Sequence, residues 1–310
     1  MLAARERVYQ VIKPTGLLRH SLLSELAGRD LYVKHENHNP TGAFKVRGGL
    51  NLLGSLPDAE RRAGVITAST GNHGQSVAFA SSRFGVACTI VVPQNNNPEK
   101  NQAMRALGAT LIEHGRDFDE AREQCEHLAR VRGLRYVHPA NEPLLIAGVG
   151  TYALEIFNEL PHIDVVFVPV GGGSGAAGLG IVRTALQRPT RIIGVQAAGA
   201  DTFTRSWRTG TRVVAARVDT MAEGVATRTT FDLTFSILQR ELDDIMTLTE
   251  EELAEGVRVA VRTTHNLAEG AGAAPLMAAL KMKDSHPYRT AVAVMSGGNL
   301  DSRLLSRLFC

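Results

Sequence analysis

The chain has 310 residues, of which 44% are apolar and 21% charged, and its formal net charge is +3. This ordinary composition excludes a disordered, collagen-like or coiled-coil protein, and the length predicts two domains or one large α/β unit. Its three cysteines, Cys88, Cys125 and Cys310, are too few and too widely spaced for a disulfide framework or a cysteine-based zinc site. Basic residues are scattered among acidic ones, so the charge does not indicate nucleic-acid binding.

The amino-terminal segment MLAARERVYQ carries charges early and lacks the apolar run of a signal peptide. Residues 165–182 are uncharged over a length that could cross a bilayer, but they include six glycines, a proline and a serine. Such a composition predicts a strand, a glycine loop and the start of a helix. We therefore expect a soluble, cytoplasmic protein with no membrane partner.

From residue 64 onward, β-branched runs alternate with helical stretches. Strands are predicted at 64–68, 88–93, 109–114, 164–170, 191–196 and 290–295, and helices at 74–84, 98–108 and 117–133. The last three strands are almost wholly apolar, which is typical of parallel strands buried on both faces. The alternation predicts βαβ units in open, doubly wound α/β sheets. Residues 200–232 are expected to form loops with one short helix.

Lys45 lies in the segment NPTGAFKVRGG, directly after Phe44. A lysine is normally a solvated surface charge. Burial beside apolar groups would lower its pKa from about 10.4 and make the amine a usable nucleophile or base. Arg47 is expected to be an ion-pairing residue at a surface or interface, and Lys34, in YVKHE, to lie on the surface.

The segment ASTGNHGQS places polar side chains at a strand-to-helix junction. Ser69, Thr70 and Asn72 offer hydrogen-bonding groups where a helix N-terminus offers free N–H donors, a combination that suits a carboxylate. Simple helix capping by Ser69 or Thr70 is an equally good interpretation. His73 is a candidate base, although a structural, hydrogen-bonded histidine is the better expectation.

Two further strand ends are rich in glycine. In VPVGGGSGAAGLG, glycines after a strand let backbone N–H groups approach an anion at a helix N-terminus, which predicts a phosphate site. The pattern is neither a P-loop nor a dinucleotide fingerprint, and a tight turn alone is the alternative. In AVAVMSGGNLD, Ser296 follows the last strand at its carboxyl end, where open α/β sheets bind ligands.

Together and in this order, these four segments resemble the fold type II pyridoxal-phosphate enzymes (tryptophan synthase β-like), in the branch of the serine/threonine dehydratases and serine racemases. The resemblance runs from KPTGLLRHS to SGGNLD and includes residues 136–156, 220–226 and 267–280. It implies two open doubly wound α/β domains. Residues 1–60 and 147–310 would form a discontinuous, cofactor-binding large domain, and 64–140 a small domain that closes over the substrate.

The resemblance also implies a role for each site residue. Lys45 would hold pyridoxal 5'-phosphate covalently, with Phe44 beside the ring, Asn72 on its phenolate oxygen, Ser296 at its pyridine nitrogen and Glu269 nearby. Gly171, Gly172, Gly173, Ser174 and Gly175 would hold the phosphate. Ser69, Thr70, Gly71, Asn72 and His73 would bind the substrate carboxylate. Thr70 occupies the position of the racemases' catalytic serine.

The implied activity is that of a dehydratase, or ammonia-lyase, acting as a homodimer. It would convert a β-hydroxy amino acid such as threonine, serine or 3-hydroxyaspartate into a 2-oxo acid and ammonia. The neutral hydroxyl of Ser296 favours β-elimination, because it does not force protonation of the ring nitrogen. A racemase or a β-replacing synthase on the same scaffold is the alternative. A remote alternative is a non-catalytic module that binds phosphate or a nucleotide. A yellow colour that borohydride bleaches would exclude this alternative, because it indicates a cofactor bound covalently to a lysine.

Two positions bear on metals and specificity. Gln196 and Thr202 stand where metal-activated members have acids, and an amide is a poor ligand for a hard cation, so we expect no metal site. Arg116, in EHGRDFDEA, is a candidate for gripping a second substrate carboxylate. The alternative is a surface ion pair with Asp117, Asp119 or Glu120.

Overall fold

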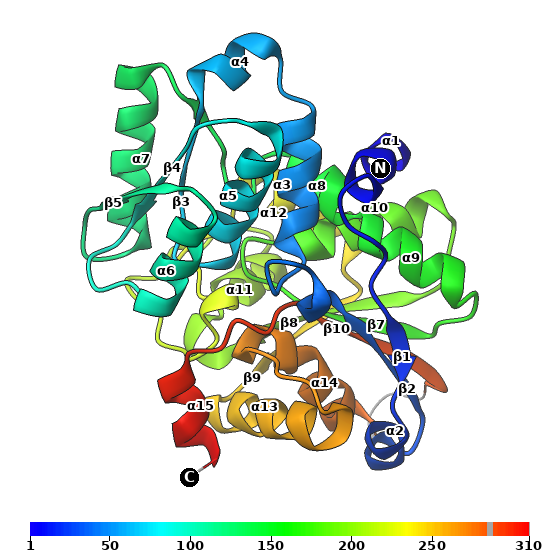
Figure 1. Ribbon diagram of the computed structural model, residues 1–310. Coiled ribbons are helices and arrows are strands. Elements are labelled where there is room, and N and C mark those ends of the chain that lie inside the picture. The colour runs from blue at the N-terminus through cyan, green and yellow to red at the C-terminus, as the bar shows by residue number, and fades with distance from the viewer. Residues whose placement is uncertain (284–287, 310) are drawn as a thin grey trace. The chain divides into compact units, whose positions relative to one another are not determined.

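The computed structural model describes residues 1–283 and 288–309. Its chain divides into two compact units, each built from two separate stretches (Figure 1). Unit 1 comprises Met1–Lys13 and Lys45–Thr151, and unit 2 comprises Pro14–Phe44 and Tyr152–Cys310. Residues 64–140, expected as the small domain, lie in unit 1 together with residues 1–13 and 45–60, which the sequence analysis assigned to the large domain.

Unit 1 contains a four-stranded parallel sheet in the order β5-β4-β3-β6. The strands are β3 (Val65–Ala68), β4 (Cys88–Val92), β5 (Thr110–Glu113) and β6 (Arg135–Tyr136), and the helices are α1 (Leu2–Tyr9), α3 (Lys45–Gly54), α4 (Asp58–Ala63), α5 (Asn72–Phe84), α6 (Pro98–Ala106), α7 (Phe118–Arg132) and α8 (Pro143–Val149). Val65 packs into a core with α1, α3, α5 and α6, whereas Ile66 packs into a second core against α7. Both faces of the sheet are therefore covered.

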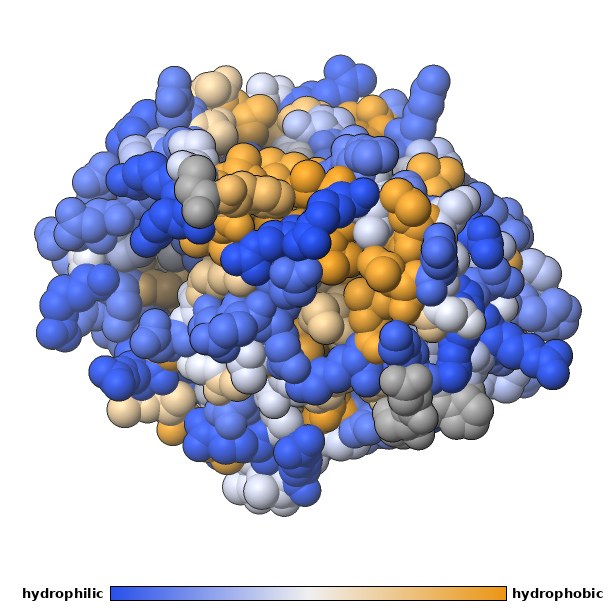
Figure 2. All heavy atoms as spheres, turned by 90° about the horizontal axis from the view of Figure 1, so that it is seen from below, coloured by the Kyte–Doolittle hydropathy of each residue, from blue (hydrophilic) through white to orange (hydrophobic). Residues whose placement is uncertain are grey.

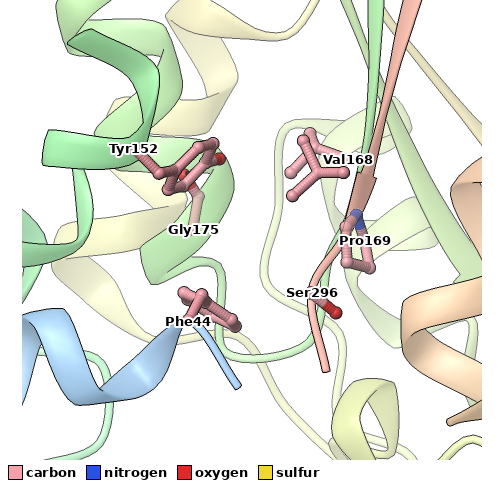
Figure 3. A pocket seen from close by; sticks show the side chains of 7 residues that line it. Phe44, Tyr152, Val168, Pro169, Gly175 and Ser296 are labelled. Carbon is pink, nitrogen blue, oxygen red and sulfur yellow. Dashed lines mark hydrogen bonds between the residues drawn. The ribbon is translucent and has the colours of Figure 1, made fainter. Parts of the chain in front are cut away.

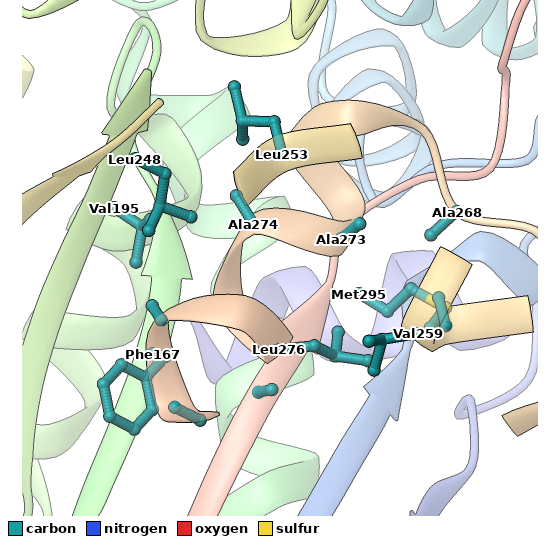
Figure 4. Close-up of a cluster of buried hydrophobic side chains, with 14 of the residues drawn as sticks. Phe167, Val195, Leu248, Leu253, Val259, Ala268, Ala273, Ala274, Leu276 and Met295 are labelled. Atoms are coloured by element: carbon teal, nitrogen blue, oxygen red, sulfur yellow. The ribbon is translucent and has the colours of Figure 1, made fainter. Parts of the chain in front are cut away.

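Unit 2 contains a six-stranded sheet in the order β1-β2-β10-β7-β8-β9, in which only the β1–β2 pair is antiparallel. Its elements are β1 (Leu17–Arg19), α2 (Ser21–Ala27), β2 (Asp30–His35), η1 (Glu36–His38), α9 (Thr151–Glu159), β7 (Val165–Pro169), α10 (Ser174–Ala185), β8 (Arg191–Ala197), η2 (Ala198–Ala200), α11 (Thr202–Thr209), η3 (Glu223–Val225), α12 (Asp232–Glu241), β9 (Asp244–Leu248), α13 (Glu250–Thr264), α14 (Gly270–Met282), β10 (Thr290–Met295) and α15 (Ser302–Phe309). Phe167 and Val195 from the sheet pack with Leu253 and Leu276 of α13 and α14 (Figure 4).

The six strands expected from the sequence are all present, as β3, β4, β5, β7, β8 and β10, and so are the three helices. Local signals set both ends of α7, as the sequence predicts. Asp117 caps its N-terminus by accepting from the Glu120 N–H, and Gly133 takes the left-handed conformation after its last turn. Residues 200–232 contain the short helix α11 among loops. The doubly wound α/β architecture is confirmed. None of the helices in the described parts of the chain combines the length and apolar character needed to cross a membrane.

Candidate active site

A pocket in unit 2 lies at the carboxyl ends of β7 and β10 (Figure 3). Its lining comprises Phe44, Tyr152, Val168, Pro169, Gly175, Val294 and Ser296. Phe44 and Tyr152 face Val168, Pro169 and Ser296 across the opening in Figure 3. This is the edge at which open parallel sheets bind ligands. The structure thus brings together Phe44, Ser296 and the glycine turn after β7.

Backbone contacts hold Phe44 beside the end of β10. The Phe44 N–H donates to the carbonyl of Ser296 at 2.9 Å, and Gly298 donates to the carbonyl of Gly42 at 2.9 Å. Gly42 has a φ of +66°, a conformation that residues with a Cβ rarely adopt. The aromatic ring is therefore positioned by the main chain, and Lys45 follows it directly in sequence.

The turn Gly171–Gly175 leads from β7 into α10, and it needs its glycines. Gly173 has a φ of +86°, a Cβ on Gly171 would lie 2.4 Å from the carbonyl oxygen of Gly224, and one on Gly175 would lie 3.2 Å from the Phe44 ring. Tyr152 Oη donates to the Gly175 carbonyl at 2.9 Å. Gly173, the residue before the first turn of α10, has no side chain with which to cap the helix. This cradle of N–H groups at a helix N-terminus fits a phosphate.

Glu269 belongs to the same part of unit 2. It precedes the first residue of α14, is only 7% exposed, and its N–H donates to the Gly297 carbonyl at 3.1 Å. A Cβ on Gly224 would lie 3.4 Å from the Glu269 carboxylate. The backbone of Glu269 is thus held against the turn that follows Ser296, and its carboxylate lies beside Gly224.

Lys45 is the first residue of α3, in unit 1. Ser76 Oγ in α5 donates to its carbonyl at 2.5 Å, and a Cβ on Gly49, one turn further along α3, would lie 2.6 Å from the Ser76 carbonyl oxygen. The two helices therefore pack closely beside the lysine. Burial lowers the pKa of Lys45 from 10.5 to about 8. About a tenth of the amine is thus neutral at pH 7, far more than at the ordinary lysine pKa, and the neutral form is the nucleophile.

The turn Ser69–His73 leads from β3 into α5. The hydroxyl of Ser69 accepts from the N–H groups of Gly71 at 3.1 Å and Gly74 at 2.8 Å, so it ties the turn together, as the capping interpretation expected. The Thr70 carbonyl accepts from Asn96 Nδ2 at 3.1 Å. Ser69 therefore shapes the turn, while Asn72 opens the helix.

His73 is a structural histidine. Its Nε2 is hydrogen-bonded to Thr67 Oγ1 at 2.9 Å, and its ring is buried. Desolvation, with the nearby positive charge of Lys45, lowers the pKa of His73 to about 3, so the ring is neutral at physiological pH. A neutral, hydrogen-bonded imidazole agrees with the structural role expected from the sequence.

Two expectations from the sequence are wrong. Lys34 is fully buried in unit 2, where its Nζ donates to Glu155 Oε2 and to the Thr15 carbonyl, both at 2.6 Å. Arg47 is fully buried in unit 1 and donates to Thr151 Oγ1 at 3.1 Å. The Lys34 charge is tolerated inside because Glu155, 121 residues away, pairs with it, and the guanidinium of Arg47 reaches a hydroxyl 104 residues away. Such distant partners leave no signal near Lys34 or Arg47 in the sequence.

Sequence reasoning also missed Lys100. Its side chain, in α6, is 9% exposed, and a Cβ on Gly71 would lie 2.9 Å from its Cδ and 3.5 Å from its Nζ. A positive charge thus lies beside the turn assigned to a carboxylate. Arg116, in contrast, is on the surface, where its side chain is 87% exposed and its Nε donates to Glu120 at 2.8 Å. This is the surface ion pair that the sequence analysis named as the alternative.

Gln196 is fully buried, and both ends of its amide are used within unit 2. Its Nε2 donates to the Val170 carbonyl at 3.0 Å, and its Oε1 accepts from the N–H and hydroxyl of Thr204 at 2.8 and 2.9 Å. In the chain apart from residues 284–287 and 310, no group of three or more His, Cys, Asp or Glu side chains has the arrangement of a metal site.

Comparison with known proteins points to one family. The family model described as "Pyridoxal-phosphate dependent enzyme" matches residues 8–297. An L-threonine ammonia-lyase from Thermotoga maritima is 37% identical over 305 residues, which are 98% of this chain and 76% of that protein. Among solved structures, threonine deaminase isoform 2 from Solanum lycopersicum is 34% identical, with a TM-score of 0.93 over 99% of this chain and 91% of that one. Maize serine racemase is 27% identical, with a TM-score of 0.94 over 99% of this chain and 95% of that one.

Proposed function

We propose that this chain, which belongs to the family of pyridoxal-phosphate dependent enzymes, is an ammonia-lyase that converts a β-hydroxy amino acid into a 2-oxo acid and ammonia. The observation that carries the proposal is the buried Lys45, whose pKa is lowered to about 8. The same chain has a pocket at the carboxyl ends of its strands that is lined by Gly175 of the glycine turn and by Ser296. The ammonia-lyase from Thermotoga maritima and the tomato threonine deaminase support threonine as a substrate.

The groups of unit 2 would hold the cofactor. The N–H groups of Gly171–Gly175 would bind its phosphate, Phe44 would pack beside its ring and Ser296 would face the ring nitrogen, with Glu269 behind that turn. When bound, pyridoxal phosphate supplies an electron sink that weakens the bond between the substrate's Cα and its hydrogen. Because Ser296 is a neutral hydroxyl, it would not force protonation of the ring nitrogen, which would favour loss of the β-hydroxyl.

The groups of unit 1 would act on the substrate. Lys45 would hold the cofactor through its amine, yield that place to the substrate's amine, and then take the proton from Cα with its neutral Nζ. Asn72 would donate to the cofactor's phenolate oxygen. The substrate carboxylate would bind at the turn Ser69–His73, where Thr70 offers a hydroxyl and the start of α5 offers N–H groups. Departure of the β-hydroxyl as water, followed by hydrolysis of the released product, would yield the 2-oxo acid and ammonia.

The test is an assay of the purified, yellow holoprotein with L-threonine, L-serine and 3-hydroxyaspartate. We expect 2-oxo acid and ammonia in equal amounts from threonine or serine. The 3-hydroxyaspartate arm reports whether a second carboxylate is accepted, for which Arg116 offers no support because it is paired with Glu120. A yellow protein that forms no 2-oxo acid from any of the three would overturn the proposal.

Racemisation is a second candidate, because maize serine racemase has a closely similar fold. It requires a proton donor on the second face of Cα, and Thr70 is the hydroxyl residue at the position implied for that role. Chiral chromatography of serine after incubation in the presence of the enzyme distinguishes the two activities. Thr70→Ser, which removes only a methyl group, is expected to raise the ratio of racemisation to elimination. Thr70→Ala is expected to abolish racemisation and to raise the KM of elimination, because it also removes a hydroxyl from the carboxylate-binding turn.

The proposal includes a homodimer and a cytoplasmic location. Leu22 and Leu26, four residues apart on α2, are 52% and 49% exposed, and Leu18 of β1 is 46% exposed. Figure 2 is seen from below the view of Figure 1, on the side where α2 and α13 lie, and it shows apolar side chains gathered in patches. Covering such side chains on a partner would remove apolar area from water. Light scattering should give the mass of a dimer, Leu22→Asp should shift it toward that of a monomer, and cell fractionation should place the protein in the cytosol.

A further inference from the structure

The turn Ser69–His73, to which the proposed function assigns the substrate carboxylate, is backed by a second loop of unit 1. β3 and β4 are neighbouring parallel strands, so the turn after β3 and the loop of residues 93–97 after β4 lie at the same edge of the sheet. The loop leads into α6, which packs beside α5 (Figure 1). A Cβ on Gly74, in the first turn of α5, would lie 2.4 Å from Met104 Sδ of α6. The loop and α6 thus pack closely behind the turn.

The peptide group between Thr70 and Gly71 is held from both sides. The N–H of Gly71 donates to Ser69 Oγ at 3.1 Å, within the turn itself. The Thr70 carbonyl accepts from Asn96 Nδ2 at 3.1 Å, which links the turn to the loop after β4. Since a peptide group is planar, fixing its N–H and its carbonyl fixes its orientation. Asn96 therefore holds this peptide group from outside the turn.

The Asn96 side chain is itself fixed. Its Nδ2 also donates to Asn101 Oδ1 at 2.6 Å, and Asn101, in α6, is only 6% exposed. Because a carbonyl oxygen can only accept, the atom of Asn96 that faces Thr70 is its NH₂ nitrogen, and both hydrogens of that group have an acceptor. The residue before it, Asn95, has a φ of +61°, a conformation that asparagine adopts more readily than most residues with a Cβ. The backbone and the α6 contact together aim the Asn96 amide at Thr70.

The side chain of Thr70 remains available to a ligand. Its hydroxyl makes no hydrogen bond to any of residues 1–283 and 288–309, and the residue is half-buried. Ser69, by contrast, spends its hydroxyl on the N–H groups of Gly71 and Gly74. A carboxylate can therefore reach the Thr70 hydroxyl without breaking a contact that the turn needs.

We propose that Asn96 is a positioning residue, which holds Thr70 so that its hydroxyl and the N–H groups at the start of α5 meet the substrate carboxylate together. The inference rests on the proposed function, because it takes this turn as the carboxylate site. Without the Asn96 amide, the peptide group after Thr70 loses its outer partner and can rotate, which turns the hydroxyl away from those N–H groups. Asn96 acts on binding, whereas the transfer of the Cα proton belongs to Lys45.

The first measurement is the binding of L-alanine, which has the amine and carboxylate of the substrate but no β-hydroxyl to lose. Its dissociation constant is read from the absorbance of the holoprotein. Asn96→Asp keeps the shape of the side chain but faces the Thr70 carbonyl with an acceptor, and should raise the dissociation constant at least about tenfold. Asn96→Ala removes the hydrogen bond alone and should raise it about threefold to tenfold. Gln94→Glu adds the same charge at an exposed position of the same loop and should leave it within about twofold.

The second measurement separates binding from chemistry and from folding. With L-threonine, both Asn96 variants should raise KM by similar factors while kcat stays within about threefold, because Lys45 is unchanged. Cofactor absorbance and the melting temperature report whether each variant is loaded and folded, and Asn96→Ala decides the question if the acid prevents folding.

Two results would overturn the proposal. One is a parent-like dissociation constant for L-alanine in a folded Asn96 variant, and the other is a loss of kcat at an unchanged KM. If threonine, serine and 3-hydroxyaspartate give no 2-oxo acid, the proposed function fails, but the L-alanine titration still decides the role of Asn96. The two failures are therefore distinguishable.

Discussion

The turns Ser69–His73 and Gly171–Gly175 both lead from a parallel strand into a helix, yet they are built differently. In the first, the Ser69 hydroxyl accepts from two backbone N–H groups, so a side chain shapes the loop. In the second, the residue before the helix is Gly173, which has no side chain, and glycines admit a φ of +86° there and close contacts around it. A side-chain-shaped turn can present hydroxyl and amide groups to a small substrate. A glycine turn presents backbone N–H groups, which suit the phosphate of a resident cofactor.

The largest effect is expected at Lys45, which belongs to the same unit as the first turn. Lys45→Ala should lower kcat at least about 10³-fold, because it removes the group that holds the cofactor and moves the Cα proton. It should also abolish the yellow, borohydride-sensitive absorbance. Lys13→Ala, an exposed lysine of unit 1, is the matched control and should behave as the parent does. Turnover by Lys45→Ala at the parent rate would reject the assignment.

The glycine turn is tested by Gly173→Ala. The alanine would have to adopt a positive φ, and its Cβ would lie 3.0 Å from side-chain atoms of Thr234 and Leu238. We therefore expect the dissociation constant of the cofactor to rise about tenfold or more. Gly28→Ala imposes a similar φ of +64° in the same unit, but nothing lies within 4 Å of its Cβ. Both variants should lose about 1–2 kcal/mol of stability, and only Gly173→Ala should lose cofactor affinity, as measured by absorbance. Equal cofactor affinity in the two would show that this turn does not hold the phosphate.

The pH dependence of cofactor loading tests the amine. Only neutral Lys45 can attack an aldehyde, and its pKa lies at about 8. Below pH 8 the loading rate of the cofactor-free protein should therefore fall about tenfold per pH unit, and above it the rate should level off. A lysine at its ordinary pKa would instead give a rate that still rises at pH 9. Stopped-flow absorbance between pH 6 and pH 10 separates the two. His73, with a pKa of about 3, should add no inflection in that range.

The smallest effect is expected from removal of divalent cations. Both ends of the Gln196 amide are hydrogen-bonded to Val170 and Thr204, so its oxygen is not free to bind a hard cation. Exhaustive treatment with EDTA should leave the rate within about twofold of the untreated enzyme. A large loss that Mg²⁺ restores would show that other oxygen ligands form a site.

Much of the candidate site follows from local patterns in the sequence. The strand and helix signals around Ser69 and Gly171 act over a few residues, so they predict strand-to-helix turns before any tertiary contact is known. They also left a choice open at Ser69, between a substrate ligand and a cap. That choice depends on where the Gly71 and Gly74 N–H groups point, which is a property of the folded turn.

The amino-acid sequence by itself determined the alternation of strands and helices, the parallel sheets, and the chemistry available at Lys45, Gly171–Gly175 and Ser296. Tertiary structure alone decided which charges are buried. Lys34 lies inside unit 2 because Glu155, 121 residues away, reaches it. Local periodicity reports backbone conformation and exposure, whereas the partner of a buried charge is set by packing between segments far apart in the chain.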